Sequence, residues 1–192
     1  MRVLGSRRVF DGRAFSVRVD EIENPSGRRW SLEVIEHPGA VAIVAVLPHS
    51  VAPAACGVSP KRPPDRQIVL VRQTRPAVGR MLLEIPAGTL EPGEAPDACA
   101  RRELAEETGY AAETWESLGA FYTAAGVSTE EMHLFLAQDL HPVSAEREEE
   151  DLTVHLVPLA EARRLVAAGE IHDSKSIIGI LLASERFGGP TA

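Results

Sequence analysis

Residues 88–110 read GTLEPGEAPDACARRELAEETGY, and the glycines and prolines of this stretch predict its secondary structure. Gly88, Pro92 and Gly93 interrupt the apolar run LLEIPA that precedes them. Pro96 suits the first turn of a helix, and Gly109 suits the position just beyond its end. We therefore predict a strand, a glycine-rich loop and a helix of roughly three turns.

Three glutamates share one face of this helix, because Glu106 and Glu107 lie three and four residues after Glu103. Like charges at this spacing repel by about 0.2–0.5 kcal/mol per pair, so the cluster needs a counter-charge or free solvation. Arg102, one turn from Glu106, supplies part of the counter-charge. Hard divalent cations such as Mg²⁺ or Mn²⁺ prefer carboxylate and carbonyl oxygen, and the turn at Ala87 can offer a carbonyl. The pattern indicates an oxygen-ligand metal site; a solvated acidic helix face is the alternative.

Composition narrows the class of protein. The chain has 192 residues, of which 44% are hydrophobic, enough for one domain with a small appendage. It has no apolar run near the roughly 20 residues of a membrane span and no apolar core of a signal peptide, so we expect a cytoplasmic protein without membrane contact. A net charge of −8 argues against nonspecific nucleic-acid binding. A small anionic substrate stays open, provided that local arginines and a bridging metal receive it.

The remaining elements follow from periodicity. Residues 7–37 alternate polar and apolar positions around two turn signals, which predicts two or three antiparallel strands. The continuous apolar run AVAIVAVL at 40–47 predicts a strand buried on both faces, where the main sheet begins. Residues 48–65 hold five prolines and predict a long surface loop.

Further strands are expected at RQIVLVRQT, WESLGAFYTA, MHLFLAQDL and VHLVPL. Two amphipathic helices are expected over LAEARRLVAAGEI and SKSIIGILLASERF, the first ended by Gly169 and the second begun by Ser174 as its N-cap. The glycine-rich end GGPTA predicts a frayed tail.

Trp30 follows two arginines, Arg28 and Arg29, and admits two interpretations. A lone aromatic residue is more often part of a core. An exposed tryptophan beside basic residues can instead stack on a nucleobase or pack in a subunit interface.

The spacing around the glutamates resembles the Nudix box. Gly88 is followed after five residues by Glu94, and after seven more by the run Arg102 to Tyr110, RELAEETGY. The flanks resemble the ADP-ribose pyrophosphatase branch of the Nudix hydrolases over about residues 30 to 187, through the segments HPGAVAIVAVL, VLVRQTRPAVGRMLLEIPAG, FYTAAGVSTEEMHLFLA and EEEDLTVHLVPLAEARRLVAAGEIHDSKSIIGILLA.

This resemblance implies an α/β/α sandwich with a mixed sheet and a small N-terminal antiparallel β appendage. We expect the appendage at 1–38, the Nudix domain at 39–187 and a frayed tail at 188–192. The branch implies a homodimer in which the N-terminal strands help to build the partner's substrate pocket. It also implies metal-dependent hydrolysis of a nucleoside diphosphate sugar, with ADP-ribose yielding AMP and ribose 5-phosphate. Another nucleotide sugar such as GDP-mannose, an oxidised nucleoside diphosphate, or a ligand-binding protein without catalysis are the alternatives.

The resemblance also assigns roles near the helix. It implies that the Ala87 carbonyl, Glu103 and Glu107 are the principal ligands of Mg²⁺ or Mn²⁺. Glu106 joins them through a second ion or water, and Glu91 is a candidate for the same outer role. The resemblance further implies that Arg102 orients the glutamates.

Further positions are implied outside the helix. Arg75, in QTRP, matches an arginine that contacts substrate phosphate or ribose, and Glu130, in STEE, matches an acidic position near the metals. Glu148 and Glu150 match loop positions from which the family draws a general base or a further ligand, and either can serve.

Two positions depart from the branch. Ala125, before Gly126, stands where the branch has the proline that separates ADP-ribose enzymes from relatives. Leu32 stands where the family has an arginine, so either one substrate contact is missing or Arg28 or Arg29 supplies it. Gly126 and Trp30 complete the expected substrate pocket.

Overall fold

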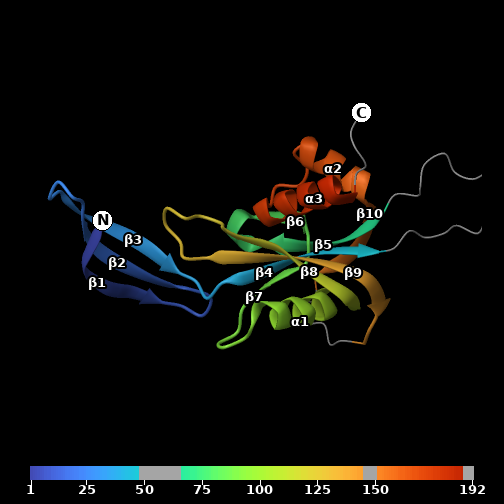
Figure 1. Cartoon of the computed structure of the whole chain (residues 1–192), viewed down its shortest axis with the longest axis horizontal. Helices are drawn as coiled ribbons and strands as arrows, with labels where there is room; N and C mark the ends of the chain where they lie inside the picture. Colours follow the sequence, from blue (N-terminus) through green and yellow to red (C-terminus); the bar gives the residue numbers. More distant parts are fainter. Residues whose placement is uncertain (48–65, 145–150, 188–192) are drawn as a thin grey trace, which may run out of the picture.

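The computed structural model describes residues 1–47, 66–144 and 151–187 (Figure 1). In chain order its elements are β1 (Arg2–Asp11), β2 (Ser16–Glu23), β3 (Arg29–Glu36), β4 (Ala40–Leu47), β5 (Gln67–Arg75), the 3-10 turn η1 (Pro76–Val78), β6 (Arg80–Glu84), β7 (Ala87–Thr89), α1 (Pro96–Thr108), β8 (Tyr110–Tyr122), β9 (Glu131–Pro142), β10 (Thr153–Pro158), α2 (Leu159–Ala167) and α3 (Ser174–Phe187).

The N-terminal strands β1, β2 and β3 form an antiparallel sheet of their own, which extends away from the body (Figure 1). The turn between β2 and β3 is built by Asn24, whose side-chain oxygen accepts hydrogen bonds from the N–H groups of Ser26 and Arg28 at 3.1 and 3.0 Å. Gly27 follows with φ of 83°, a left-handed conformation that glycine adopts without strain. The expected turns and the antiparallel appendage are confirmed, with three strands.

The body is a seven-stranded sheet with the order β10-β5-β4-β9-β8, while β6 pairs with β5 and β7 pairs with β4. The sheet is mixed, because β4 and β9 run parallel and the other pairs run antiparallel. Helix α1 covers one face, and α2 and α3 cover the other (Figure 1). The predicted α/β/α sandwich with a mixed sheet is therefore confirmed.

Strand β4 is the centre of both cores, as its continuous apolar run predicts. Alternate side chains pack towards α2 and α3 or towards α1; these are Ala42, Val44 and Val46 on the first side and Val41, Ile43 and Ala45 on the second. Each of the six is at most 1% exposed, and burying a Val or Ile side chain contributes about 1.5–3 kcal/mol. Both helix layers are thus held on one rigid strand.

The start of α3 corrects one prediction. Ser174 is the first residue of the helix, and Asp173 supplies the cap: its Oδ2 accepts hydrogen bonds from the N–H of Ser176 at 2.9 Å and from the Ser176 hydroxyl at 2.6 Å. A carboxylate can accept both bonds at once, which explains why Asp173 takes the position. Gly169, with φ of 68°, follows α2 as expected.

Some predictions lie outside the described residues: the proline-rich loop at 48–65, the loop carboxylates Glu148 and Glu150, and the tail at 188–192. Among the helices that the structure describes, none is both long and apolar enough to cross a lipid bilayer.

Candidate active site

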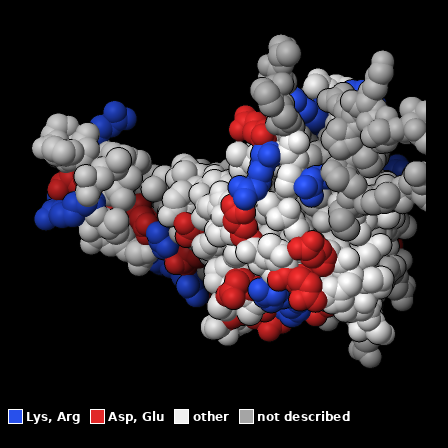
Figure 2. All heavy atoms as spheres, turned by 45° about the vertical axis from the view of Figure 1, so that its right-hand side comes forward, with Lys and Arg blue, Asp and Glu red and all other residues white. Residues whose placement is uncertain are grey.

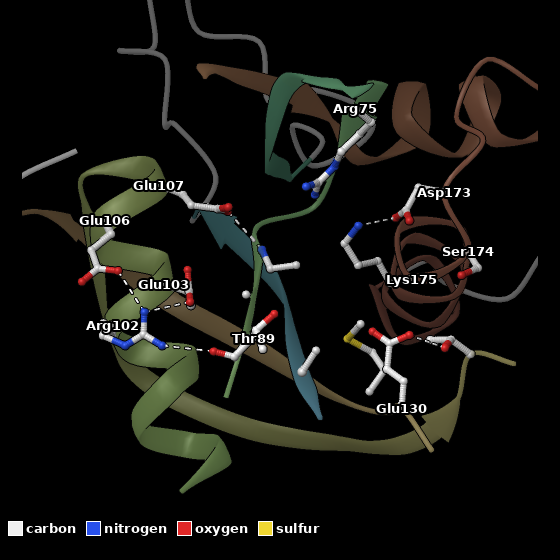
Figure 3. A pocket seen from close by; sticks show the side chains of 15 residues that line it. Arg75, Thr89, Arg102, Glu103, Glu106, Glu107, Glu130, Asp173, Ser174 and Lys175 are labelled. Atoms are coloured by element: carbon white, nitrogen blue, oxygen red, sulfur yellow. Dashed lines mark hydrogen bonds and ion pairs between the residues drawn. The ribbon is translucent and has the colours of Figure 1, made fainter. Parts of the chain in front are cut away.

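One polar pocket of about 510 Å³ gathers most of the predicted site residues of the body (Figure 3). Its lining comes from β4, β5, β7, α1, the β8–β9 region and the start of α3, and consists of Ala40, Arg75, Ala87, Gly88, Thr89, Arg102, Glu103, Glu106, Glu107, Thr123, Glu130, Met132, Asp173, Ser174 and Lys175. Glu103, Glu106 and Glu107 lie on one side, and we call them the carboxylate wall. Arg75 and Lys175 lie opposite and form the cation wall (Figure 3).

Gly88 lets the carboxylate wall approach the backbone of β7. A Cβ atom added at Gly88 would lie 1.9 Å from the carboxyl carbon of Glu103, far inside any permitted contact. The Glu103 carboxylate therefore occupies the space that a side chain would take. This close packing is the physical reason for a glycine 15 residues before Glu103.

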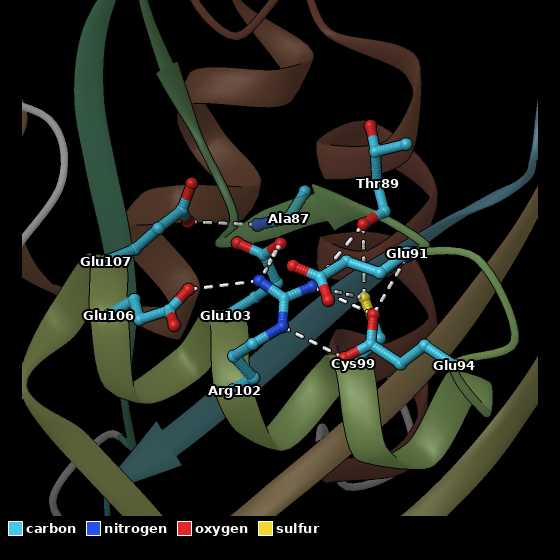
Figure 4. Close-up of polar contacts among 9 residues, drawn as sticks. All are labelled: Ala87, Thr89, Glu91, Glu94, Cys99, Arg102, Glu103, Glu106 and Glu107. Carbon is cyan, nitrogen blue, oxygen red and sulfur yellow. Dashed lines mark hydrogen bonds and ion pairs between the residues drawn. The ribbon is translucent and has the colours of Figure 1, made fainter. Parts of the chain in front are cut away.

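Arg102 partly neutralises the glutamates and so reduces the repulsion between them (Figure 4). Its Nε and Nη2 atoms donate to the two carboxylate oxygens of Glu94, both at 2.9 Å. Its Nη1 atom donates to Glu103 at 2.8 Å and to Glu106 at 3.0 Å. The bidentate bond to Glu94 holds the guanidinium in one orientation, so Arg102 can bridge two members of the carboxylate wall.

The same contacts shift two pKa values in opposite directions. Hydrogen bonds from Arg102 and from the Glu91 N–H lower the pKa of Glu94 to about 2. Burial raises the pKa of Glu103, and the neighbouring carboxylates of Glu106 and Glu94 push it in the same direction while Arg102 opposes them. The carboxylate wall therefore carries more negative charge than its single arginine compensates.

The donor chemistry of this wall fits a hard divalent cation, since it consists of carboxylate oxygens beside the backbone of β7. Each carboxylate is engaged: Glu103 and Glu106 by Arg102, and Glu107 by the Ala87 N–H at 3.0 Å. Within the described part of the chain, no three Asp, Glu, His or Cys side chains are already arranged to hold a metal ion. These hydrogen bonds use one oxygen of each carboxylate, and the right ligand types for such an ion are therefore present.

The cation wall is organised by Glu84, the last residue of β6, which is 1% exposed. Arg75, at the end of β5, donates to its two carboxylate oxygens at 3.0 and 2.8 Å. The Lys175 ammonium lies 2.5 Å from one of the same oxygens and 3.0 Å from Asp173. Burial alone would raise the pKa of Glu84, but its contacts with Arg75 and Lys175 outweigh burial and lower it. Glu84 is therefore held ionised between two cations.

Glu130 also lines the pocket and lies below Lys175 in the view of Figure 3. The Thr123 hydroxyl donates a hydrogen bond to it, and Nδ1 of His37 lies 4.0 Å from its other oxygen. The structure thus brings Glu130 into the same pocket as the carboxylate wall. The space-filling view shows acidic side chains clustered on the body, with basic side chains among and above them (Figure 2).

The arginines and the tryptophan at 28–30 are not among the residues that line this pocket of the same chain. They belong to the N-terminal sheet, where Arg29 pairs with Glu23 at 2.8 Å. Trp30 is 37% exposed on β3, so the core interpretation of Trp30 is wrong for the single chain. Trp30 lies on β3, an edge strand of the three-stranded sheet, whereas its cross-strand partner Ile22 on the central strand β2 is 5% exposed.

Other predicted residues are also absent from the lining. Gly126 lies in a turn closed by a 2.9 Å bond from the Val127 N–H to the Ala124 carbonyl, and its surroundings are open. Glu91 is exposed and contributes its backbone N–H to Glu94.

Sequence reasoning missed the partners that organise the cation wall: Glu84, Asp173 and Lys175. One signal was present, because Glu84 is a charged residue inside the apolar run LLEIPA. A charge is expensive to bury unless it is paired, so it predicts partners, but the sequence does not say which.

A mixed α/β/α sandwich that presents the spacing Gly-x5-Glu-x7-Arg-Glu-x2-Glu-Glu to a polar pocket defines the Nudix class of proteins. Residues 52–177 match the NUDIX domain, and the chain belongs to this family. The family expected from the sequence is confirmed.

Similar proteins cover nearly the whole chain. The ADP-ribose pyrophosphatase of Bacillus subtilis (strain 168) is 35% identical over 182 residues, which is 93% of this chain and 90% of that protein. The ADP-ribose pyrophosphatase of Mycobacterium tuberculosis (strain ATCC 25618 / H37Rv) is 39% identical over 93% of this chain and 80% of its own length. A crystal structure of an ADP compounds hydrolase superposes with a TM-score of 0.77 at 25% identity, covering 96% of this chain and 92% of that one.

Proposed function

We propose that this protein hydrolyses the diphosphate of a nucleoside diphosphate sugar, with ADP-ribose giving AMP and ribose 5-phosphate. The observation that carries the proposal is the opposition of the carboxylate wall and the cation wall across one pocket in a chain of this family. A diphosphate carries negative charge along its length, so it suits a pocket that holds cations on one side and ligands for a divalent ion on the other. The two ADP-ribose pyrophosphatases that resemble this chain support the choice of sugar nucleotide.

Nudix hydrolases generally need a divalent metal ion. We assign Glu103, Glu107 and the Ala87 carbonyl as its principal ligands, with Glu106 and Glu91 in outer roles and Mg²⁺ or Mn²⁺ as the ion. When bound, such an ion neutralises phosphate oxygens and so favours attack of water on phosphorus.

Side chains of the protein position the metal ligands, contact the diphosphate and accept the proton of the attacking water. Arg102 keeps the carboxylates of Glu103 and Glu106 in place, and Arg75 faces the diphosphate. We assign the proton transfer from the attacking water to a loop carboxylate, Glu148 or Glu150. One P–O bond of the diphosphate breaks, and the water oxygen ends on the phosphorus that was attacked.

We further propose a cytoplasmic homodimer that pairs through the N-terminal sheet. Val3, Val9 and Phe10 of β1 are 58%, 46% and 52% exposed, an unusual apolar exposure for a single chain. Pairing would cover these side chains and let residues 28–30 and the turn at Gly126 contribute to substrate pockets of the dimer.

Product analysis in ¹⁸O-labelled water tests the proposal. The protein is given ADP-ribose with Mg²⁺ or Mn²⁺, and GDP-mannose and an oxidised nucleoside diphosphate serve as comparison substrates. We expect AMP and ribose 5-phosphate from ADP-ribose, with the label in one of the two products identifying the phosphorus attacked. If no AMP forms, the assignment to ADP-ribose fails, and turnover of another substrate identifies the alternative.

A further inference from the structure

Lys175 stands out in a chain that relies on arginine. Only two of its 20 basic residues are lysines, Lys61 and Lys175. Lys175 is 7% exposed, and it lies in the first turn of α3, where its ammonium faces the pocket (Figure 3). A buried ammonium is costly unless it is paired, so its partners are expected to explain it.

Both partners of Lys175 are carboxylates of the same network. Its Nζ atom lies 2.5 Å from Oε2 of Glu84 and 3.0 Å from Oδ2 of Asp173. Oε2 of Glu84 also accepts a hydrogen bond from Nη2 of Arg75 at 2.8 Å. One carboxylate oxygen is therefore shared between the lysine and the arginine.

The frame around this network is rigid. The Ser176 hydroxyl accepts a hydrogen bond from the Ile85 N–H at 2.9 Å and donates to Asp173 at 2.6 Å, which joins the start of α3 to the residue after Glu84. Farther along α3, a Cβ at Gly179 would lie only 2.8 Å from Val44, so the helix is seated directly on β4. These contacts thus set where the start of α3, which carries Lys175, lies relative to Glu84.

We propose that Lys175 is a positioning residue for the reaction, which neutralises Glu84 and Asp173 so that the guanidinium of Arg75 is presented to the substrate diphosphate. The four side chains sum to zero charge when Lys175 is present and to one negative charge when it is absent. Without it, Arg75 is the one basic residue left to neutralise two carboxylates, and a diphosphate meets a repulsive wall. This inference rests on the proposed function for the identity of the substrate.

The chemistry of lysine suits this place. An ammonium is a compact point charge with three donors, whereas the planar guanidinium requires a flat fork of acceptors. The two carboxylate oxygens at 2.5 and 3.0 Å from Nζ belong to different residues and offer no such fork. Arginine at 175 would retain the charge with imperfect geometry.

The test compares Lys175→Met with Lys175→Arg, and uses Arg186→Met as the matched control. Arg186 lies on the same helix and pairs with Glu116 at 2.6 Å, outside the pocket lining. Because lost ground-state binding appears in KM, we expect Lys175→Met to raise KM for ADP-ribose about tenfold and to change kcat less than about threefold. Lys175→Arg recovers most of the loss, and Arg186→Met behaves as wild type. A wild-type KM in Lys175→Met overturns the inference.

A double-mutant cycle asks whether Lys175 acts through Arg75. Coupled residues give non-additive effects, so adding Lys175→Met to Arg75→Met should raise KM less than about twofold further. If the two effects multiply fully, Lys175 acts independently of Arg75 and the positioning role is wrong. A purely structural role would lower stability without this coupling.

Removing one member of a buried ion pair can prevent folding, so a second variant is needed. Asp173→Asn with Lys175→Met removes one charge of each sign and leaves the pair of Arg75 and Glu84 intact. The remaining charges sum to zero, so we expect KM to lie within about threefold of wild type, and a KM still raised about tenfold contradicts the inference.

Inorganic pyrophosphate with Mg²⁺ separates this inference from the proposed function. By titration calorimetry, we expect Lys175→Met to weaken its binding about tenfold while Arg186→Met leaves it unchanged, since the cation wall meets the diphosphate itself. A wild-type protein that binds pyrophosphate but hydrolyses no nucleotide sugar would refute the proposed function and leave Lys175 in its role. Pyrophosphate binding that does not depend on Lys175 would refute the role alone.

Discussion

The two walls of the pocket differ in how the chain builds them. The carboxylate wall comes from one continuous stretch, residues 87–107, in which β7, its glycine and α1 follow each other directly. The cation wall consists of Arg75 at the end of β5 and Lys175 at the start of α3, and their shared partner Glu84 is the last residue of β6. Glu84 and Lys175 are 91 residues apart. A site built from one local stretch is readable from spacing, whereas a site assembled from distant segments becomes visible only in the fold.

The walls also differ in how their charge is balanced. Arg102 bridges several carboxylates and leaves an excess of negative charge, which suits a site that takes up a cation. Arg75 and Lys175 are matched by Glu84 and Asp173. In the carboxylate wall, activity should therefore be most sensitive to loss of a metal ligand. In the cation wall, it should be most sensitive to loss of one charge from the network of cations and carboxylates.

The largest effect is expected from Glu107→Gln. Glutamine can still accept the hydrogen bond from the Ala87 N–H, so the fold should remain, while the charge that binds a divalent ion is lost. Activity should fall by more than about 100-fold, the upper end of what outer-shell partners of a metal cost. Steady-state kinetics at saturating Mg²⁺ and a thermal melt measure both points. Glu113→Gln, whose side chain is 76% exposed, is the control, and retained activity in Glu107→Gln would remove Glu107 from the ligands.

Gly88→Ala tests the close contact within the carboxylate wall. The new methyl group would meet the Glu103 carboxyl carbon at 1.9 Å and must push it away. We expect activity to fall about 10- to 100-fold, because a misplaced group next to a metal site costs that much. Gly5→Ala, where nothing lies within 4 Å, should have no effect on kcat/KM. Wild-type kinetics in Gly88→Ala would show that the position of Glu103 is unimportant.

Arg102→Met should change how stability depends on pH. Because the folded-state pKa of Glu94 is lowered from 4.5 to about 2, Glu94 contributes stability above pH 4.5 that is lost as the pH falls towards 2. Without Arg102 this contribution disappears and the glutamates repel each other at neutral pH. Urea unfolding from pH 7 to pH 3 should therefore show the variant less stable at pH 7, with the difference from wild type shrinking as the pH falls. A constant difference would mean that Arg102 stabilises the fold by packing alone.

The smallest effect is expected at Asp173, which pairs with Lys175 of the cation wall. Asp173→Ala removes the cap of α3 and should lower the free energy of unfolding by about 1 kcal/mol. Asp173→Asn keeps the cap, since asparagine is nearly as good in this position, and should cost less than about 0.5 kcal/mol. Chemical denaturation resolves the two. If asparagine is as costly as alanine, the charge of Asp173 matters more than its role as a cap.

Much of the fold is predictable because it depends on local patterns. The apolar run at 40–47 predicts a strand buried on both faces, and β4 meets that description because it lies between α1 and the pair α2 and α3. Proline and glycine predict the limits of α1, which runs from Pro96 to Thr108 with Gly109 in a left-handed conformation after it. These signals act through backbone geometry within a few residues, so no distant contact is needed to read them.

The failures have an equally physical origin. A lone aromatic residue such as Trp30 favours a core, but Trp30 lies on an edge strand of the N-terminal sheet and is exposed. Ser174 is a good capping residue, but Asp173 precedes it and its carboxylate accepts two bonds. Glu84 is visible as a charge in an apolar strand, yet its partners come from β5 and α3. In each case the outcome depends on the neighbours that surround the residue in the folded chain.

The sequence by itself determined the family, the strand-loop-helix with its glutamates and the buried central strand, since these follow from spacing and periodicity along a continuous backbone. Only the tertiary structure decided that Arg102 clamps Glu94 together with the carboxylate wall, that Glu103 lies where a Gly88 side chain would be, and that Glu84 holds Arg75 and Lys175 together. Coulomb interactions and close packing act through space, and they act between residues that the chain brings together only when the sheet and both helix layers have formed.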